Sequence, residues 1–393
     1  MDGRPDPRRW LVLVVGLLGL TAGCAAQYGL ASLIPALRGE GLSLAEATLL
    51  VTAPIVGIIL TLIAWGAAAD RWGERVVLVT GLGGAGMAAL GATLVAALPA
   101  RLVFLFLVGA TSSAIHAASG RLILGWFGPT ERGLAMGIRQ MGQPLGVGVA
   151  ALVLPTLALA GTGRAFAALS ASCLGTAALI WGVVRDPARV ATAATSGASP
   201  YREPYLWRIH ASSGMLVIPQ WTVAVFAFDY LVTALGWSIG AAGALLAASQ
   251  LAGAGSRLAA GWWSDRVGSR LGPMRIVAVI IGLAMVALVL LGLAGTSVVA
   301  LALGVAAAVT TTSNGLAFTA VAERAGPTWA GRALGIQNTV QNLVASLAAP
   351  PLALVIVAAG GGGFGYALAF GAVAALPFVA AVVIPARQER SVA

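Results

Sequence analysis

About twelve apolar runs, each long enough to cross a lipid bilayer, divide this chain of 393 residues. A helix needs roughly 20 apolar residues to span the hydrocarbon core, where the backbone must satisfy its own hydrogen bonds. Only 9% of the residues are charged, against about 25% in a soluble domain. We therefore expect an all-α membrane protein with helices near residues 10–36, 44–66, 76–98, 102–125, 134–158, 165–184, 209–235, 239–263, 275–294, 298–321, 333–358 and 366–384.

Arginines are distributed unevenly between the breaks that separate these runs. One side of the alternating layout holds only Arg38, Arg101 and Arg164, and the other side holds Arg4, Arg8, Arg9, Arg71, Arg75, Arg132, Arg185, Arg189, Arg202, Arg208, Arg266, Arg270, Arg275, Arg324, Arg332, Arg387 and Arg390. Basic loops stay in the cytoplasm. We expect a multi-pass protein of the cytoplasmic (inner) membrane, in contact with the lipid bilayer, with both termini in the cytoplasm.

The net charge of +10 does not indicate a nucleic-acid partner. Such proteins gather their basic residues on one wet face, whereas here the arginines lie in short breaks between apolar runs. No nucleic acid is therefore expected to bind.

One long polar stretch, residues 185–208, is rich in Pro, Ser, Thr, Gly and charged residues. Such a stretch cannot build a packed core and is typical of a linker. It predicts an N-terminal six-helix bundle over residues 1–184, a cytoplasmic linker over residues 185–208 and a C-terminal six-helix bundle over residues 209–393.

Three matches at nearly constant spacing indicate that the two halves are repeats. The pattern Gly-x-x-x-Asp-Arg-x-Gly-x-Arg occurs at residues 66–75, after the second run, and at residues 261–270, after the eighth. Residues 133–138 match residues 331–336, and the turns at residues 41–43 and 236–238 also agree. Duplicated halves are typical of secondary transporters.

The duplicated loop pattern resembles the loop signature of the major facilitator superfamily, and the layout matches that family over essentially the whole chain. This resemblance implies twelve transmembrane helices in two pseudo-symmetric six-helix bundles. Glu74 departs from the pattern, because the family usually has a basic residue there, and Leu105 stands where an arginine is expected early in helix 4. Residues 142–146 do not reproduce the Gly-Pro motif of drug/proton antiporters, which disfavours a drug exporter.

The two acids of the loop pattern, Asp70 and Asp265, are expected to close the cytoplasmic side. A carboxylate is stabilised at the positive N-terminal end of a helix, and repeat symmetry predicts helix 11 as the partner of Asp70 and helix 5 as the partner of Asp265. The alternative is that both are solvated turn charges. The candidate gating residues are Gly66, Asp70, Arg71, Gly73, Arg75, Gly261, Asp265, Arg266, Gly268 and Arg270.

Arg257 lies inside helix 8, eight residues before Asp265. A buried arginine costs roughly 2.5–3.5 kcal/mol on the insertion scale. An arginine at this spacing resembles the anion-binding arginine of monocarboxylate, oxalate and nitrate porters of the superfamily. Nitrate porters have a second arginine in helix 2, where Leu62 stands here, and this argues against nitrate. The alternative is a structural arginine paired with Asp229 or with carbonyl groups.

Polar side chains recur at repeat-related positions inside the predicted helices. Those at positions 139, 140 and 143 match those at 337, 338 and 341, and each set lies on one helix face. They are expected to line a cavity, or alternatively to join helices by hydrogen bonds. The substrate-binding candidates are Arg257, Arg139, Gln140, Gln143, Gln27, Tyr28, His116, Trp221, Asn314, Gln337, Asn338 and Gln341. The proton-coupling candidates are Asp229 and His116, with an arginine partner and a packing histidine as the respective alternatives.

Several other patterns carry no chemistry. Residues 81–86 satisfy the Gly-x-Gly-x-x-Gly pattern of dinucleotide sites, but they lie in an apolar helix with no preceding strand, so helix packing explains them. Cys24 and Cys173 lie singly in apolar runs and indicate neither a zinc site nor a disulfide. We expect no enzyme activity, no catalytic residue, no cofactor and no metal.

The sequence thus predicts a secondary active transporter, a symporter or antiporter, that moves a small organic anion by alternating access and functions as a monomer. A carboxylate is the favoured substrate class, and a proton is the candidate coupling ion. Two membrane arginines, Arg139 and Arg257, against one membrane acid favour an anion. Efflux of a drug or metabolite is the alternative.

Overall fold

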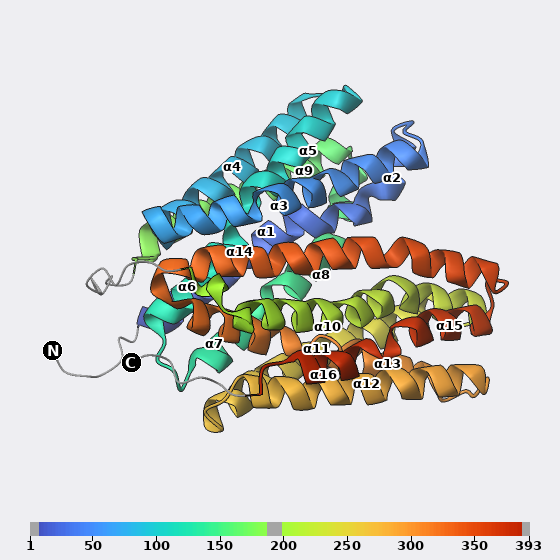
Figure 1. The fold of residues 1–393 in the computed structure, drawn as a ribbon. Coiled ribbons are helices and arrows are strands. Elements are labelled where there is room, and N and C mark those ends of the chain that lie inside the picture. Colours follow the sequence, from blue (N-terminus) through green and yellow to red (C-terminus); the bar gives the residue numbers. More distant parts are fainter. Residues whose placement is uncertain (1–7, 187–198, 387–393) are drawn as a thin grey trace. The chain divides into compact units, whose positions relative to one another are not determined.

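The computed structural model describes residues 8–186 and 199–386, and every regular element in these ranges is helical (Figure 1). Ten described stretches are long and apolar enough to span a membrane. One of them, Val299–Ala358, has 60 residues and can cross twice. Helix α11 (Ile239–Arg266) also has spanning length, with 28 residues, although it is not among the ten. The predicted all-α membrane fold is therefore confirmed.

The described residues belong to two compact units, the first made of Met1–Gly128, Ile138–Ser199 and Ala325–Thr339. Its elements are α1 (Arg8–Tyr28), η1 (Gly29–Leu33), α2 (Ile34–Gly39), α3 (Leu44–Trp72), α4 (Glu74–Leu94), α5 (Leu98–Ser112), α6 (Ala114–Trp126), α8 (Gly142–Ala158) and α9 (Thr162–Val183). Helices α4, α5 and α9 run side by side (Figure 1). Their apolar side chains, such as Leu78, Leu82 and Phe166, form part of the core of this unit.

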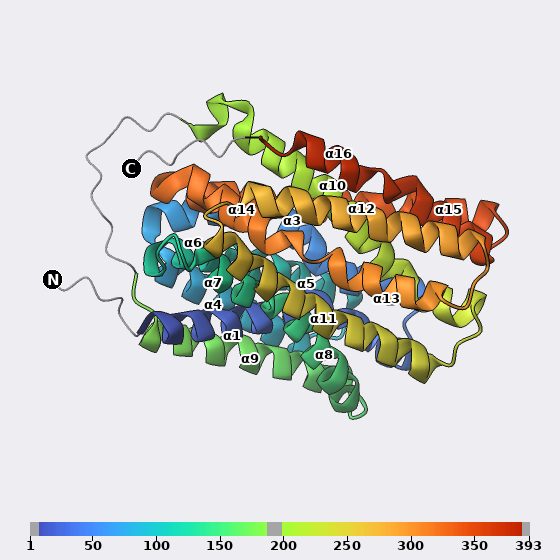
Figure 2. The ribbon, with the colours of Figure 1, turned by 90° about the horizontal axis from the view of Figure 1, so that it is seen from below.

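The second unit consists of Pro129–Gly137, Pro200–Arg324 and Val340–Ala393. Its elements are η2 (Pro200–Arg202), α10 (Pro204–Asp229), η3 (Tyr230–Ala234), α11, α12 (Leu271–Leu293), α13 (Val299–Val309), the greater part of α14 (Ser313–Ala358), α15 (Gly363–Ala374) and α16 (Leu376–Val383). Helices α12, α15 and α16 pack together, and α16 also packs on α10 (Figure 2).

Each unit contains a short segment from the other half of the sequence. Most of α7 (Arg132–Gln140) belongs to the second unit, and residues 325–339 of α14 belong to the first. The division into residues 1–184, 185–208 and 209–393 stays a prediction. Helix α10 begins at Pro204, inside the stretch expected to be a linker, and residues 187–198 lie outside the described residues.

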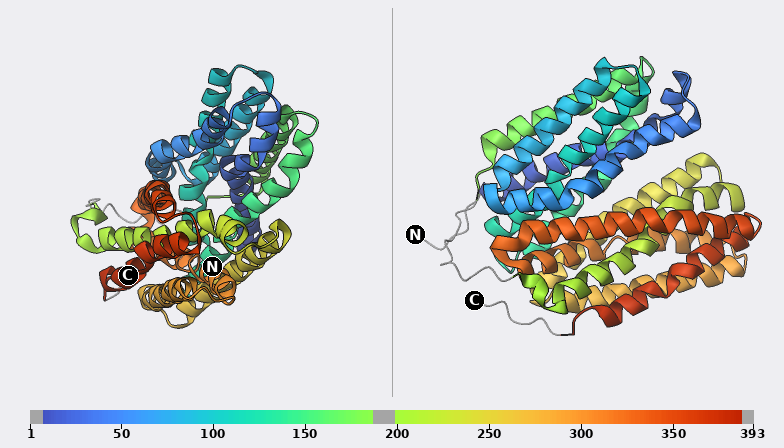
Figure 3. Two further views of the ribbon diagram at one scale, coloured as in Figure 1. Left: turned by 90° about the vertical axis from the view of Figure 1, so that its right-hand side faces the viewer. Right: turned by 45° about the horizontal axis from the view of Figure 1, so that its top comes forward.

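Helix α14 is interrupted at Gly326. Figure 3 shows α14 in orange as one long element. Gly326 has φ 69° and ψ 175°, a conformation that glycine adopts without steric cost. Pro327 follows and has no N–H group to continue the helical ladder. The interruption therefore separates two membrane crossings within one element and starts the helical segment whose first part belongs to the first unit.

Two further interruptions lie at repeat-related positions. Helix α5 ends at Ser112 and α6 begins at Ala114, while α13 ends at Val309 and α14 begins at Ser313. Hydroxyl groups bond back to the preceding turn, as the Thr310 hydroxyl does to the Ala306 carbonyl at 2.8 Å. Such breaks release backbone carbonyls from the helical ladder, and these carbonyls can then accept from side chains of neighbouring helices.

Candidate functional site

Each of the two loop motifs turns at a glycine with positive φ. Gly73 lies between α3 and α4 with φ 96°, and Gly268 lies between α11 and α12 with φ 62°. Both values are in the left-handed region, which residues with a Cβ rarely adopt. The motif glycine is therefore required by the backbone, and it places the motif aspartate in the last turn of the preceding helix.

Asp265 caps the first turn of α7. Its carboxylate accepts hydrogen bonds from the backbone N–H groups of Gly133 at 2.9 Å and Leu134 at 2.8 Å. The first N–H groups of a helix have no partner in the helix itself and carry a partial positive charge. The contact predicted between Asp265 and helix 5 is thus confirmed, whereas its gating role stays a prediction.

Asp70 makes the repeat-related contact in the first unit. It accepts from the N–H groups of Gly331 at 2.8 Å and Arg332 at 3.0 Å, in the helical segment that follows the break at Gly326. This is the predicted contact with helix 11. Gly133 and Gly331, which are 198 residues apart in the sequence, therefore make equivalent contacts with the two motif aspartates.

Glycines let the backbones of these helix pairs touch. A Cβ on Gly66 would collide with the Gly331 carbonyl, and a Cβ on Gly261 would collide with the Gly133 carbonyl. One turn further along, the ideal Cβ position of Gly335 lies 2.7 Å from the Leu62 carbonyl oxygen. The corresponding position on Gly137 lies 2.9 Å from the Arg257 carbonyl oxygen. Leu62 and Arg257 are therefore structurally equivalent, as the sequence comparison of helices 2 and 8 assumed.

An arginine also holds the motif aspartate in the second unit. Arg270 pairs with Asp265, and its Nη2 and Nε groups donate to the two oxygens of Glu323 at 3.0 and 3.2 Å. Arg132 lies 4.0 Å from the same glutamate. Burial lowers the pKa of Arg270, but the hydrogen bonds and charges of Glu323 and Asp265 outweigh it and raise the pKa overall.

The arginine that does this in the first unit was not among the residues predicted from the sequence. Arg121 in α6 donates to Asp70 at 2.6 Å and also pairs with Glu74. Arg121 lies inside the predicted span 102–125, and a charged residue inside a membrane span is itself a sign of a functional or paired residue. It also corrects the charge comparison, because Arg121 is a further arginine inside a span and the two acids neutralise it.

Arg257 is 5% exposed in α11, and its Nε group donates to the Thr311 carbonyl at 3.0 Å. Thr311 lies at the break between α13 and α14, which explains why its carbonyl can accept. One of the two alternative partners, a carbonyl, is therefore present. The other, Asp229, instead accepts from the Tyr366 hydroxyl at the end of α10.

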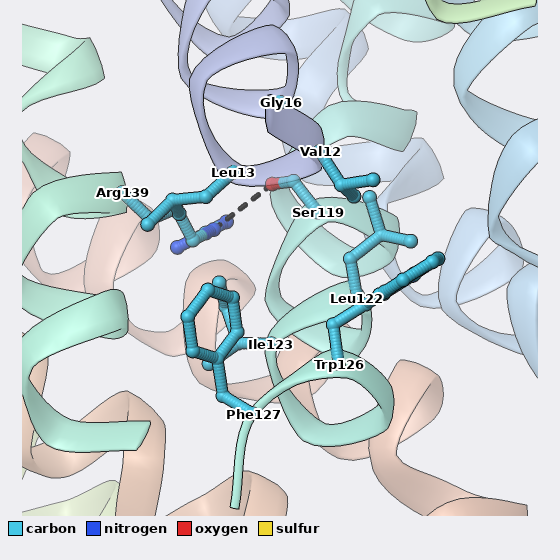
Figure 4. Close-up of a pocket in the computed structure, with 9 residues that line it drawn as sticks. All are labelled: Val12, Leu13, Gly16, Ser119, Leu122, Ile123, Trp126, Phe127 and Arg139. Atoms are coloured by element: carbon cyan, nitrogen blue, oxygen red, sulfur yellow. Dashed lines mark hydrogen bonds between the residues drawn. The ribbon is translucent and has the colours of Figure 1, made fainter. Parts of the chain in front are cut away.

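Arg139 is almost fully buried in the first unit. Its Nε group donates to the Ser119 hydroxyl at 2.9 Å (Figure 4). Its Nη2 group donates to the His116 carbonyl at 2.6 Å. The cavity beside it has a volume of about 10 Å³ and is otherwise lined by apolar side chains such as Leu122 and Phe127. That volume is the lower limit for one water molecule, so this cavity is too small for an organic anion.

Gln27 and His116 form a hydrogen-bonded chain with Ser112. The Ser112 hydroxyl donates to the Val108 carbonyl and accepts from Gln27 Nε2 at 2.9 Å. The Gln27 side-chain oxygen is thereby directed at His116 Nε2, 2.8 Å away, and must accept from it. Neutral His116 therefore carries its hydrogen on Nε2, and Nδ1 is the nitrogen that an additional proton would occupy.

A corresponding amide chain occupies the second unit. Asn314 donates to Gln220 at 3.1 Å, and Gln341 donates to Ser213 at 2.8 Å and to Asn314 at 3.3 Å. Asn314 is the repeat counterpart of His116. The structure therefore brings Asn314 and Gln341 together, and it joins the helices with the same residues that were predicted to line a cavity.

The remaining candidates are dispersed over several helices. Tyr28 ends α1 and Trp221 lies in α10, both half-buried. Gln140 ends α7 and accepts from Arg139, whereas Gln143 lies in α8. Gln337 and Asn338 are buried in α14, where Asn338 donates to the Leu334 carbonyl. Within the described ranges, no group of three or more His, Cys, Asp or Glu residues could hold a metal ion.

The sequence matches the model of the Major Facilitator Superfamily over residues 11–350. The chain belongs to this family. Because such proteins are transporters, this facilitator is a multi-pass membrane transporter and not an enzyme.

Relatives and solved structures agree with that assignment. The facilitator is 41% identical to an uncharacterized MFS-type transporter of Mycobacterium tuberculosis, over 96% of this chain and 85% of the relative. It is 30% identical, over 64% of each chain, to a probable nitrate/nitrite transporter of the same species, NarK2. The crystal structure of the Escherichia coli fucose:proton symporter FucP shares the fold, with a TM-score of 0.75 and 16% identity over 96% of this chain and 100% of that one.

Proposed function

We propose that this facilitator is a secondary active transporter of a small organic anion, with a carboxylate as the recognised group, and that its two six-helix halves alternate access. Its location would be the cytoplasmic (inner) membrane, with both termini in the cytoplasm. It would function as a monomer, as a symporter or antiporter.

Buried Arg257 is the observation that carries this proposal. A guanidinium inside an apolar helix is costly, and such residues mark substrate pathways. Its Nε group is held by the Thr311 carbonyl, a neutral acceptor. The two Nη nitrogens carry four further N–H donors in a planar fork, which matches the two oxygens of a carboxylate. Lysine cannot reproduce this geometry.

The position of Arg257 also links anion binding to the motif contact. Arg257 and Asp265 lie on the same helix, eight residues or about 12 Å apart. The backbone of α11 touches α7 at both levels, through Arg257 with Gly137 and through Gly261 with Gly133. A displacement of α11 on anion binding would therefore reach the Asp265 cap without an intermediate element.

The other candidates have supporting roles in this proposal. Arg139 supplies a second positive group, and the amides fix the orientation of the substrate. His116 and Asp229 are the two candidates for the coupling proton, because the first has Nδ1 available for protonation and the second is a carboxylate held by Tyr366. The nitrate/nitrite relative supports a small anionic substrate, while Leu62 at the place of a second arginine disfavours nitrate itself.

Binding of labelled mono- and dicarboxylates to purified variants tests the proposal. Arg257→Ala is expected to weaken binding by about 30-fold or more, because hydrogen bonds between charged groups contribute roughly 1.5–3 kcal/mol each. Arg257→Lys should recover only a small part of this loss. Arg208→Ala is the matched control, because Arg208 is an exposed arginine of the same unit whose Nε group also donates to a backbone carbonyl, that of Val383 at 2.9 Å.

Thermal unfolding of each variant separates binding from folding. If Arg257→Ala binds every carboxylate as the wild type does while remaining folded, the anion site is wrong, and efflux of a drug or metabolite becomes the better hypothesis. If stability and binding fall together, Arg257 has a structural role through its carbonyl partner.

A further inference from the structure

The charge networks around Asp70 and Asp265 are built from equivalent elements with opposite signs. At Asp265, an arginine comes from the start of α12 (Arg270) and a glutamate from the helix that follows α13 (Glu323). At Asp70, a glutamate comes from the start of α4 (Glu74) and an arginine from the helix that follows α5 (Arg121). In both networks one arginine bridges the motif aspartate and one glutamate.

The motif arginine of the first repeat cannot replace Arg121. Arg75 occupies the motif position of Arg270, but its backbone N–H donates to Asp186 at 2.8 Å and its guanidinium lies 4.1 Å from the centre of the Trp181 ring. The loop pattern alone would therefore assign the wrong arginine to Asp70. Glu74, which departs from the family pattern, is the residue that the altered network requires.

We propose that Glu74 and Arg121 are the positioning residues of Asp70, and that they form a sign-inverted copy of the Arg270–Glu323 pair around Asp265. Arg121 fixes one carboxylate oxygen of Asp70, Oδ1, so that both oxygens are directed at the N–H groups of Gly331 and Arg332. Glu74 in turn pairs with the Nε group of Arg121 and so holds the guanidinium in place. Arg121, Glu74 and Asp70 are all nearly excluded from solvent, and removing one member leaves an uncompensated buried charge.

This inference rests on the gating role proposed for Asp70. It predicts the effect of exchanging Glu74 and Arg121, which the loop pattern alone does not predict. Exchanging the two residues, as Glu74→Arg with Arg121→Glu, would give the first unit the polarity of the second. An arginine at the start of α4 could then bridge Asp70 and a helix-borne glutamate, as Arg270 bridges Asp265 and Glu323. The exchange should therefore restore what either single substitution destroys.

Cysteine accessibility measures the contact without any substrate. In a Cys24→Ser, Cys173→Ser background, Ala333→Cys reports the helical segment that Asp70 holds, and Ala135→Cys is its repeat counterpart beside Asp265. Both alanines are fully buried. The rate of modification by a small maleimide is measured for each reporter in protein reconstituted in nanodiscs.

Glu74→Gln or Arg121→Gln is expected to raise the rate at position 333 by about tenfold or more, because one partner of a buried pair is removed. The rate at position 135 should stay within about twofold of the background. The exchange variant should return the rate at position 333 to within about threefold of the background, and Arg75→Gln should leave it unchanged.

An exchange variant that is folded but labels as fast as the single variants overturns the inference. If that variant does not fold, Glu74→Gln combined with Arg121→Gln decides: a combined effect smaller than the product of the single effects supports the pair, and a strictly multiplicative effect refutes it. Asp70→Asn distinguishes failure of the gating role of Asp70 from failure of the positioning role of Glu74 and Arg121. If it does not accelerate labelling, the gating role itself fails, whereas acceleration by Asp70→Asn but not by Arg121→Gln rejects only the positioning role.

Discussion

Replacing Gly66 by alanine tests whether close backbone contact is what allows Asp70 to reach its partner helix. The added Cβ would lie 2.7 Å from the carbonyl carbon of Gly331 and 2.9 Å from the Cα of Arg332. Both neighbours are backbone atoms, so no side-chain rotation relieves the collision. The nearest backbone atom is the Gly331 carbonyl oxygen, which would lie 2.3 Å from the added Cβ. To bring this distance to an ordinary contact of 3.4 Å, the two helices must separate by about 1.1 Å.

That separation determines the expected magnitude. The distances from Asp70 to the N–H nitrogens of Gly331 and Arg332 would grow from 2.8 and 3.0 Å to about 3.9 and 4.1 Å, where a hydrogen bond is lost. Hydrogen bonds to a charged group contribute roughly 1.5–3 kcal/mol each, which sets an upper limit of about 3–6 kcal/mol for the pair. Because water compensates part of this, we expect a loss of about 2 kcal/mol or more, or roughly 30-fold in the equilibrium.

The assay is maleimide labelling of Ala333→Cys in the cysteine-free background, with and without Gly66→Ala. Gly83→Ala in α4 is the matched control, because no atom lies within 4 Å of its ideal Cβ position. It should leave the labelling rate unchanged and stabilise the helix by about 0.5–1 kcal/mol, as alanine does at an unhindered helical glycine. A folded Gly66→Ala protein that labels at the background rate would refute the reasoning, since the helices would then not need this contact.

Three further predictions concern the motif acids, the coupling proton and the topology. Asp70→Asn and Asp265→Asn should slow turnover while substrate affinity changes little, because each residue stabilises a conformation and not the substrate; a collapse of affinity with unchanged labelling kinetics would contradict this. Asp229→Asn should abolish accumulation driven by a pH gradient while exchange of labelled substrate continues, because Tyr366 holds the carboxylate that would accept the proton; unchanged pH-driven uptake would remove Asp229 from the coupling step. A cysteine at Arg202 should react with an impermeant maleimide only from the cytoplasmic side, and labelling from outside would reverse the proposed orientation.

Much of the architecture could be predicted because its causes are local. The requirement for roughly 20 apolar residues per crossing fixed the helices to within a few residues, as for α12 (Leu271–Leu293) against the expected 275–294. The duplicated glycines and aspartates predicted the contacts of Asp70 and Asp265, because internal repetition carries information about three dimensions that a single helix does not.

Other features depended on packing between distant residues. Helical periodicity places Arg139 and Gln140 near one another, but it does not say which neighbouring helix each side chain meets. Arg139 turned out to bond a serine hydroxyl and a carbonyl of α6, and Asp229 met a tyrosine 137 residues later in the chain. Such partners depend on how the helices pack, and the sequence gives no direct measure of which side chain meets which carbonyl or carboxylate.

The sequence by itself determined that this chain crosses a membrane many times, that its halves are repeats and that their acids meet helix starts. Only the tertiary structure decided which arginine serves each acid. In the sequence, Glu74 is a departure from the loop pattern and Arg121 is a single charged residue in an apolar run. In the structure, Arg121 pairs with both Glu74 and Asp70. The physical reason is that charge compensation in a low-dielectric interior depends on distance in space, and residues 74 and 121 are adjacent only after α4 and α6 have packed.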